Sequence, residues 1–393
     1  SSDLGADADR GGRVHGVSVG RQSSVKRNRN NYSFGDSHID VPSGDVAKLK
    51  ANVAAIRTLK EIEESGLPAT DEQKAILAKY SGWGGLSNAL NDEKYNARKS
   101  YYGADKNWNE KYLPYYEQLI ELLTPEEFRS AVQSTTTSHY TPETVIRSMW
   151  DIAGRIGVKG GDVSEPAMGI GRIIGLMPDE TSSRSRISGY EIDSLSGRIS
   201  KALYPDANIK VQGYETEFFP QSKDLVITNV PFGKQAPYDK ALEKTLKKQM
   251  KGAYNLHNYF IAKSLLELKE GGIGIFVTSS ATMDGASSRF REFASSGGFD
   301  LVGAIRLPND AFQKDAGTSV TADVLVFRRR KSGEKPNEIN FISTTQIGEG
   351  NYQENGETRT KPIMVNEYFA SHPEMMLGEM MTAYDAGSEI GRA

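Results

Sequence analysis

The sequence predicts an α/β fold in which a mainly parallel sheet follows a helical region. Between Gly160 and Phe327, short β-like runs alternate with helical patterns, which is typical of helices packed on a parallel sheet. Upstream, residues 45–150 show apolar residues at three- and four-residue steps. We divide the 393 residues into a basic flexible arm (1–45), a helical region (46–135), an α/β domain (136–330) and a C-terminal extension (331–393).

The composition excludes several kinds of site. The chain has no cysteine, so disulfides, zinc–thiolate sites, iron–sulfur clusters and cysteine nucleophiles are absent. The five histidines show no H-x-x-x-H spacing, and we expect no catalytic metal. No run approaches the roughly 18 apolar residues of a membrane span, and the N-terminus lacks the apolar stretch of a secretory signal. We therefore expect a cytoplasmic protein without a membrane partner.

The net charge of −3 argues against a uniformly basic nucleic-acid coat, so charge has to be judged segment by segment. Positions 10–30 hold six cationic residues and no acidic one. Such an arm suits nucleic-acid phosphates, with Arg27 and Arg29 as candidate contacts, and a solvated tail is an equally good interpretation.

Helix signals follow in order. The apolar positions of residues 46–62 recur at helical spacing and stop at Gly66. A T-x-x-Q capping box at Thr70 predicts a second helix that ends at Gly82. Thr124-Pro125 and Thr141-Pro142 each predict a helix with proline at its first position.

Seven strands are expected in the α/β domain. They are Asp162–Glu165, Ile187–Glu191, Ile209–Gln212, Asp224–Thr228, Ile273–Thr278, Leu301–Ile305 and Asp323–Arg328. No clear helix separates the last two, so we expect an antiparallel hairpin at the edge of the sheet. Residues 331–393 are polar with weak periodicity and give no element.

A glycine-rich turn follows the first predicted strand. Between strand and helix, the segment 165–171 reads E-P-A-M-G-I-G, which lets a ligand approach the backbone closely. Glu191 ends the next strand 20 residues after Gly171, where an acid can accept hydrogen bonds from both ribose hydroxyls of an adenosine-type cofactor. The glycine motif alone fits a structural turn better, and its context favours nucleotide-type binding.

A second turn, N-V-P-F, directly follows the apolar strand that contains residues 225–227. An aromatic amine is a poor nucleophile, and two acceptors aimed at its hydrogens favour a reactive geometry. The side-chain oxygen of Asn229 and the carbonyl of Val230 are candidates for these acceptors, with Pro231 holding the turn rigid and Phe232 stacking on the base. Taken alone, the four residues fit a strand-ending turn with a buried aromatic better.

Residues 233–252 form a lysine-rich insertion beside this turn, with six lysines against two acidic residues. The candidate DNA contacts in it are Lys234, Lys244, Lys247, Lys248 and Lys251. A solvated surface helix with charge pairs four residues apart is nearly as good an interpretation. For Trp83, between glycines, core packing is favoured over a DNA wedge.

Together these motifs resemble the S-adenosylmethionine-dependent adenine-N6 DNA methyltransferases whose cofactor motifs precede N-P-P-Y/F. The resemblance covers roughly residues 135–330 and implies a Rossmann-like seven-stranded methyltransferase sheet and S-adenosylmethionine as cofactor. It assigns the segment from His139 to Pro142 to the N-terminal cofactor motif, and Glu191 to the ribose. The cofactor residues that it implies are Tyr140, Thr141, Pro142, Glu165, Pro166, Ala167, Gly169, Gly171, Glu191, Ile192 and Glu215, the last with Tyr214 as an alternative.

Two further likenesses extend this one. The segment R-L-P-N-D-A-F (306–312), followed by T-S-V-T (318–321), resembles type I restriction modification subunits. The segments 27–32, 80–86 and 229–233 resemble very large phage and mobile-element proteins in which a methyltransferase region precedes a helicase. A helicase domain or subunit is therefore an expected partner beside DNA.

Val230 departs from N-P-P-F, although a valine still supplies the backbone carbonyl. No target-recognition domain of about 100 residues follows Phe327.

The resemblance implies methyl transfer from S-adenosylmethionine to the exocyclic N6 of an adenine flipped out of DNA, by direct in-line displacement. Two alternatives remain. One is methylation of a protein glutamine, whose amide also fits an N-x-P-F pocket. The other is a catalytically silent module that binds cofactor or DNA within a helicase-containing assembly.

Overall fold

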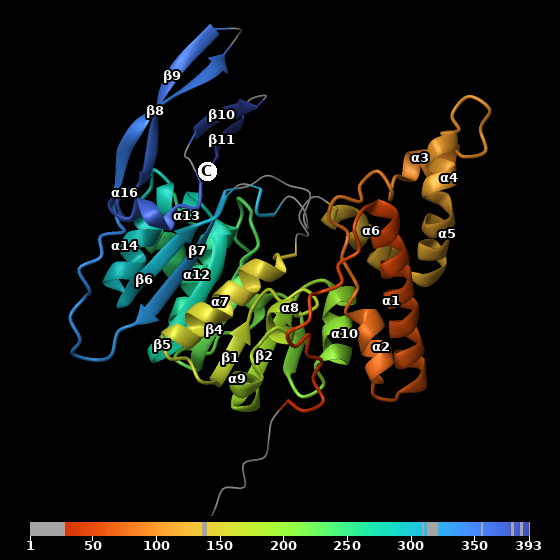
Figure 1. The fold of residues 1–393 in the computed structure, drawn as a ribbon, viewed down its shortest axis with the longest axis horizontal. Helices are drawn as coiled ribbons and strands as arrows, with labels where there is room; N and C mark the ends of the chain where they lie inside the picture. The colour runs from red at the N-terminus through yellow and green to blue at the C-terminus, as the bar shows by residue number, and fades with distance from the viewer. Residues whose placement is uncertain are drawn as a thin grey trace, which may run out of the picture.

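The computed structural model describes residues 28–135, 140–308, 310–312, 321–354, 357–378, 381–385 and 388–392. At its centre lies a seven-stranded sheet with helices against both faces, and a helical region stands beside it (Figure 1). The predicted fold class, a mainly parallel α/β sheet with a helical region before it, is confirmed.

The sheet has the order β3-β2-β1-β4-β5-β7-β6. Its strands are β1 (Gly161–Glu165), β2 (Ser185–Glu191), β3 (Asn208–Val211), β4 (Lys223–Asn229), β5 (Leu268–Ser279), β6 (Phe299–Arg306) and β7 (Ala322–Arg329). Strands β1 to β5 pair in parallel, whereas β7 runs antiparallel to both β5 and β6. All seven predicted strands are therefore present, and the predicted antiparallel hairpin at the edge is confirmed.

Alternation along β4 explains why the sheet needs helices on both faces. Leu225 and Ile227 pack into one apolar cluster with α7 (Glu143–Arg155) and α10 (Ser194–Leu203). Val226 points the other way, into a cluster with α12 (Leu256–Glu267) and α14 (Arg289–Ser296). Because successive strand residues face opposite sides, a strand buried on both faces becomes a continuous apolar run.

The helical region comprises α1 (Asp45–Ser65), α2 (Asp71–Leu77), α3 (Asp92–Ala97), α4 (Lys106–Lys111), α5 (Leu113–Leu122) and α6 (Pro125–Ser134). Helix α1 ends at Gly66 in the left-handed conformation, as predicted. The capping box at Thr70 is present, and Thr124 forms a second one that closes on Glu127. None of the described helices is long and apolar enough to cross a membrane.

Two predicted boundaries were wrong. Helix α2 ends at Leu77 instead of continuing to Gly82, because residues 78–82 form a turn whose backbone is held by other segments. Pro142 is the N-cap of α7 and not its first helical residue, since its ψ of 142° is extended. Pro125, by contrast, is the first residue of α6, as predicted.

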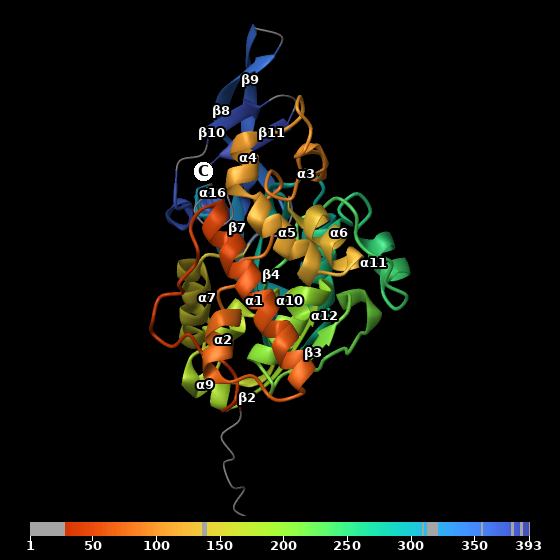
Figure 2. The same ribbon diagram turned by 90° about the vertical axis from the view of Figure 1, so that its right-hand side faces the viewer.

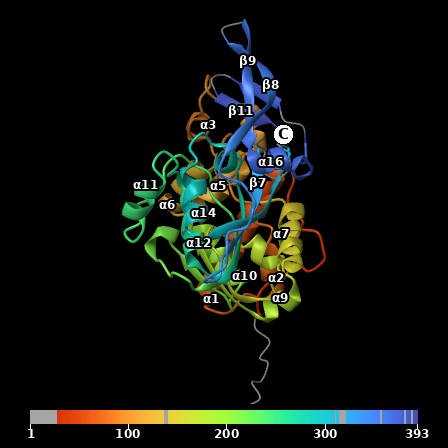
Figure 3. The same cartoon turned by 90° about the vertical axis from the view of Figure 1, so that its left-hand side faces the viewer.

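The segment after β7 has more structure than its polar sequence predicted. It forms the hairpin β8 (Thr344–Glu354) and β9 (Glu357–Asn366), then α16 (Glu367–Ser371), η2 (Pro373–Met375) and the hairpin β10 (Met381–Asp385) and β11 (Ser388–Arg392). The β8–β9 hairpin projects from the body (Figures 1 and 3). Its described side chains are mostly exposed, so no buried face imposes an apolar alternation that a sequence would reveal.

Candidate active site

The glycine turn between β1 and α8 (Arg172–Gly175) is rigid and steeply bent. Gly169 and Gly171 have φ values of 55° and 79°, which favour glycine. A Cβ on Gly171 would lie 2.5 Å from the ring of Tyr204, so a larger residue does not fit. The hydroxyl of Tyr204 donates to the Gly171 carbonyl at 2.7 Å, and the Gly171 amide donates to the Met168 carbonyl at 2.7 Å.

Glu191, the last residue of β2, holds this turn from the neighbouring strand. Its Oε2 accepts from the Gly169 amide at 2.7 Å, and its Oε1 accepts from the Asp193 amide at 2.8 Å. A carboxylate offers about four lone pairs, so capacity remains for two more donors, as the two hydroxyls of a ribose would be. Burial raises the pKa of Glu191 to about 7.

Glu165, the last residue of β1, lies behind the same turn and is only 2% exposed. Its Oε2 has no hydrogen-bond partner among the described residues. Burial raises the pKa of Glu165 well above its ordinary value, and the nearby Glu191 raises it further. A buried, unpartnered carboxyl oxygen beside a glycine turn indicates a place where a ligand donates.

Tyr140 covers the glycine turn from the other side. Its ring lies between Gly82 and Gly169, and a Cβ on either glycine would come within 2.9 and 3.0 Å of it, respectively. The Arg172 guanidinium lies 4.3 Å from the centre of the ring. Thr141 and Pro142, which follow Tyr140, are buried, so of these predicted cofactor residues only Tyr140 reaches the surface of the site. His139 lies outside the described residues.

The helical region contributes to the site through a buried asparagine that was not predicted, which fixes the turn at Gly82 beside Tyr140. Asn52 of α1 donates from Nδ2 to the Gly82 carbonyl at 2.7 Å, and its Oδ1 accepts from the Ser81 amide at 2.9 Å. A polar residue within the apolar stripe of α1 was the available signal. Trp83, next to this turn, is buried in the core, as favoured from the sequence.

The N-V-P-F turn lies at the carboxyl end of β4, beside β1 in the sheet. The Oδ1 of Asn229 is buried and has no partner among the described residues. Val230 is buried, and its amide donates to the Val277 carbonyl at 3.0 Å, which fixes the turn to β5. Pro231 and Phe232 are half-buried, and Phe232 packs against the apolar clusters of both sheet faces. The parallel strands β1, β2 and β4 thus bring Glu165, Glu191 and Asn229 to one edge.

The remaining predicted cofactor residues differ in accessibility. Pro166 is buried, whereas Ala167 is half-buried at the glycine turn. Ile192 is 75% exposed, which is unusual for a large apolar side chain and leaves it free to pack on a planar ligand. Glu215 lies in η1 (Tyr214–Thr216) and is half-buried. Tyr214 is buried, and its hydroxyl donates to Glu267 at 2.9 Å, so Glu215 is the more accessible of the two alternatives.

The lysine-rich insertion projects beside the turn as a short helix, α11 (Glu243–Gln249) (Figures 2 and 3). Lys234, Lys244, Lys247, Lys248 and Lys251 are all exposed. Lys247 pairs with Glu243 at 2.5 Å, as the surface-helix interpretation expected. The other four have no ion pair within the described residues, so they are available to phosphates.

A buried ion pair that the sequence analysis missed fixes this insertion to the rest of the site. Asp239 accepts from Lys263 Nζ at 2.8 Å and from the Tyr259 hydroxyl at 2.7 Å, and both members of the ion pair are fully buried. Lys263 also donates to the Tyr214 carbonyl at 2.7 Å. One ammonium group therefore joins the insertion to the segment that carries Glu215. A lysine within the otherwise apolar α12 was the only sequence signal.

A buried histidine stands at the start of α12, directly after the residue that contacts the turn. The amide of Leu256 donates to the Gly233 carbonyl at 3.1 Å. Both ring nitrogens of His257 lack a partner within the described part of the chain. Burial lowers the pKa of His257 to about 4, so the ring is neutral at pH 7. A single histidine in an apolar helix carries no sequence signal, and it was not predicted.

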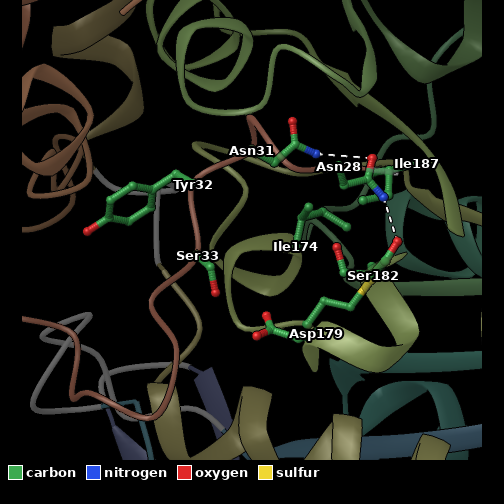
Figure 4. Close-up of a pocket in the computed structure, with 9 residues that line it drawn as sticks. Asn28, Asn31, Tyr32, Ser33, Ile174, Asp179, Ser182 and Ile187 are labelled. Atoms are coloured by element: carbon green, nitrogen blue, oxygen red, sulfur yellow. Dashed lines mark hydrogen bonds between the residues drawn. The ribbon is translucent and has the colours of Figure 1, made fainter. Parts of the chain in front are cut away.

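Arg29 lies far along the strands from the predicted site. Its neighbour Asn28 donates from Nδ2 to the carbonyls of Ser182 and Ser185, at 2.6 and 3.1 Å, beside a cavity of about 50 Å³ (Figure 4). Ser185 begins β2, whereas Glu191 ends it, so the structure does not bring the exposed Arg29 to the edge that holds Asn229. Arg27 lies outside the described residues.

The arginine of the R-L-P segment is structural. Arg306 is fully buried and pairs with Asp323 through Nε at 2.8 Å and Nη2 at 2.9 Å. Asp284 accepts from the same guanidinium at 2.7 Å, and it also accepts from the Asn366 amide at 2.8 Å. This group ties the root of the β8–β9 hairpin to the sheet. Residues 309 and 318–320 of the same likeness lie outside the described residues.

Comparison with known proteins gives a family match for part of the chain. Residues 168–297 match the family model described as Eco57I restriction-modification methylase. This match confirms the predicted resemblance to restriction-modification methyltransferases for that part of the chain.

Two kinds of relative accompany the match. The chain is 24% identical over 309 residues to the Defense against restriction protein B of Escherichia phage P1, covering 78% of this chain and 11% of that protein. Among solved structures, it is similar to a type I restriction-modification methyltransferase subunit of Streptococcus thermophilus, with 15% identity, 74% and 68% coverage and a TM-score of 0.43. A DrdV–DNA complex shows 12% identity, 72% and 36% coverage and a TM-score of 0.44. The chain thus spans about a ninth of the curated relative's length.

Proposed function

We propose that this chain transfers a methyl group from S-adenosylmethionine to the exocyclic N6 of adenine in DNA. The observation that carries the proposal is the buried, unpartnered Oδ1 of Asn229 at the carboxyl end of β4. Ligands of open α/β sheets bind at that edge, and an acceptor without a protein partner is suited to a substrate donor. The match of residues 168–297 to a methylase family supports the reaction class.

The residues at the edge fit the cofactor. Glu191 has acceptor capacity left for ribose hydroxyls, and Ala167 of the glycine turn is half-buried beside it. The unpartnered Oε2 of Glu165 and the ring of Tyr140 adjoin the same turn, and Ile192 and Glu215 offer further contacts. When bound, S-adenosylmethionine supplies an electrophilic methyl group on its sulfonium.

On the substrate side, Asn229 Oδ1 and the Val230 carbonyl would accept the two hydrogens of the adenine amine and orient its lone pair toward the methyl group. Phe232 would stack on the extruded base, and Pro231 would keep the turn in place. The nitrogen–methyl bond forms as the sulfur–methyl bond breaks, and the amine then loses a proton to solvent. The exposed lysines of the insertion would bind the DNA backbone beside the flipped nucleotide.

The test is incubation with isotopically labelled S-adenosylmethionine and mixed-sequence duplex DNA, followed by digestion and mass spectrometry of the nucleosides. We expect labelled N6-methyl-2′-deoxyadenosine with the wild-type chain and none with Asn229→Ala. Label in a protein glutamine, measured in the same reaction with added protein, would contradict the DNA substrate. Cofactor binding without any labelled product, with or without a helicase-containing partner, would favour the silent module.

A further inference from the structure

The loop that joins α3 to α4 exposes two adjacent tyrosines. Tyr101 and Tyr102 are 92% and 96% exposed, the highest values for large apolar side chains among the described residues. Their ring centres lie 5.0 Å apart in an edge-on arrangement. Each aromatic side chain can bury roughly 150–250 Å² in a contact. Two such residues side by side at a tip present a surface suited to a partner.

Helices α3 and α4 flank this loop and form its base, whereas Tyr101 and Tyr102 form its tip. Hydrogen bonds and ring stacking fix the base and so hold the tip in place. Asp105 caps α4 by accepting from the Trp108 amide at 2.9 Å, and the Trp108 indole donates to the Asn88 carbonyl at 2.7 Å. Tyr95 of α3 stacks on Tyr116 of α5 with ring centres 4.3 Å apart. The aromatic residues of the base are thus partnered, in contrast to the two at the tip.

The charge around the tip is positive. From residue 94 to residue 106 there are four cations and one acid, Asp105, which pairs with Lys94 at 3.2 Å. Lys99 and Lys106, on either side of the tyrosines, are exposed and have no ion pair within the described chain. The other exposed apolar loop of this region, at Leu67 between α1 and α2, has the opposite charge. Residues 61–73 hold five acidic residues and no basic one.

The positive tip lies at the same end of the molecule as the candidate active site. The hairpin of α3 and α4 rises at the top of Figures 1 and 2, as does the β8–β9 hairpin on the other side. That is the end toward which β1, β2 and β4 run, since the segment that enters the described chain at the bottom of Figure 1 contacts the amino end of β2 through Asn28. The acidic turn between α1 and α2 lies toward the bottom of the same view.

We propose that the α3–α4 tip binds duplex DNA away from the target adenine, and this inference rests on the proposed function. Lys99 and Lys106 pair with phosphates, and Tyr101 and Tyr102 pack on sugars and bases in a groove. In such a contact, the cations neutralise phosphates and the aromatic side chains pack on sugars and bases. Together with the exposed lysines of the insertion, this tip gives the enzyme a second contact with its substrate.

The test is the affinity of the chain for a fluorescent duplex of about 30 base pairs, roughly three helical turns, by anisotropy with Tyr101→Ser/Tyr102→Ser. We expect affinity to fall about tenfold, because the variant removes the contact area of both aromatic side chains with the DNA. Lys99→Ala should lower the slope of log affinity against log salt by about one. The KM for DNA should rise in the tyrosine variant while kcat at saturating DNA stays unchanged.

Leu67→Ser is the matched control, because it removes a 68% exposed apolar side chain from the acidic loop. We expect its DNA affinity to equal that of the wild type. Equal affinity of the tyrosine variant and the wild type would overturn the proposal and would favour a protein partner for the tip. Anisotropy needs no turnover, so a failure of the adenine assignment leaves this result interpretable.

Discussion

The polar side chains at the two ends of the parallel strands differ in whether they have hydrogen-bond partners. At the amino end, Asn28 donates to two carbonyls, and the Oδ1 of Asn31 accepts from the Asp206 amide at 2.8 Å. At the carboxyl end, the buried oxygens Asn229 Oδ1 and Glu165 Oε2 have no partner among the described residues. Since an unpaired buried polar group costs about 1–3 kcal/mol, such groups persist where a ligand completes them.

This difference separates structural motifs from binding motifs that look alike in sequence. The segment R-N-R-N-N-Y is rich in groups that suit a ligand, yet its described asparagines hold the arm on the sheet: Asn30 donates from its amide to Asp206 at 2.9 Å. The tyrosine that ends the segment donates its amide to the Leu203 carbonyl at 2.8 Å. The N-V-P-F turn is fixed to β5 through the Val230 amide, and the side-chain acceptor of Asn229 remains available among the described residues.

Asn229→Ala should show the largest effect on activity. Removal of an acceptor that acts on the reacting amine is expected to lower kcat by about 10²–10³-fold, as for other preorganised polar groups. Stability to denaturant should stay the same or rise, because the lost oxygen is buried and has no protein partner among the described residues. Steady-state methyl transfer measures the expected loss of kcat, and urea unfolding measures stability. A large loss of stability would contradict the role given to Asn229.

Gly171→Ala should damage both the fold and cofactor binding. The φ of 79° disfavours a side chain, and the added Cβ would clash with Tyr204 at 2.5 Å. We expect a loss of more than about 1 kcal/mol in unfolding free energy together with weaker binding of S-adenosylhomocysteine by calorimetry. Gly66→Ala is the control, because Gly66 also has a positive φ but its added Cβ would contact nothing within 4 Å. It measures the cost of the backbone conformation without a clash.

Asn28→Ala, at the amino end of the strands, should lower stability and leave activity unchanged. It removes the donor to the Ser182 and Ser185 carbonyls, so unfolding free energy should fall by about 0.5–1.5 kcal/mol. The kcat for methyl transfer should equal that of the wild type at a temperature where both are folded. A lowered kcat with unchanged stability would show that this end also belongs to the active site.

Glu165→Gln should give the smallest effect, and one that depends on pH. Because the pKa of Glu165 is raised in the folded state, the folded protein binds a proton that the unfolded chain releases above the ordinary glutamate pKa. Wild-type stability therefore falls as pH rises from about 4.5 toward the raised pKa. Thermal melts without cofactor should match at pH 4.5, and the variant should melt a few degrees higher at pH 8. Equal melts at pH 8 would contradict a buried carboxylate.

The fold and the main lines of the site could be predicted because they leave local signals. Buried strands produce apolar runs, Thr70 and Thr124 begin capping boxes, and Glu191 stands at a fixed spacing from the glycine turn. The connections between distant segments could not be predicted. Lys263 joins three segments through atoms 49 and 24 residues away in sequence, and no periodicity reports such a contact.

The β8–β9 hairpin and the role of the helical region were also beyond the sequence. Most described side chains of the hairpin are exposed and therefore impose no apolar alternation. The turn at Gly82 depends on Asn52, which lies 30 residues earlier. The roles given to the site residues are proposals that the experiments above address, and the division into domains stays a prediction.

The central claim is that the carboxyl end of the strands holds the chemistry and the amino end holds the structure. The most direct test compares Asn229→Ala with Asn28→Ala in the labelled methyl-transfer assay on DNA, with nucleosides identified by mass spectrometry. We predict that labelled N6-methyl-2′-deoxyadenosine forms with the wild type and Asn28→Ala and is lost with Asn229→Ala. Equal product from the two variants would contradict the claim.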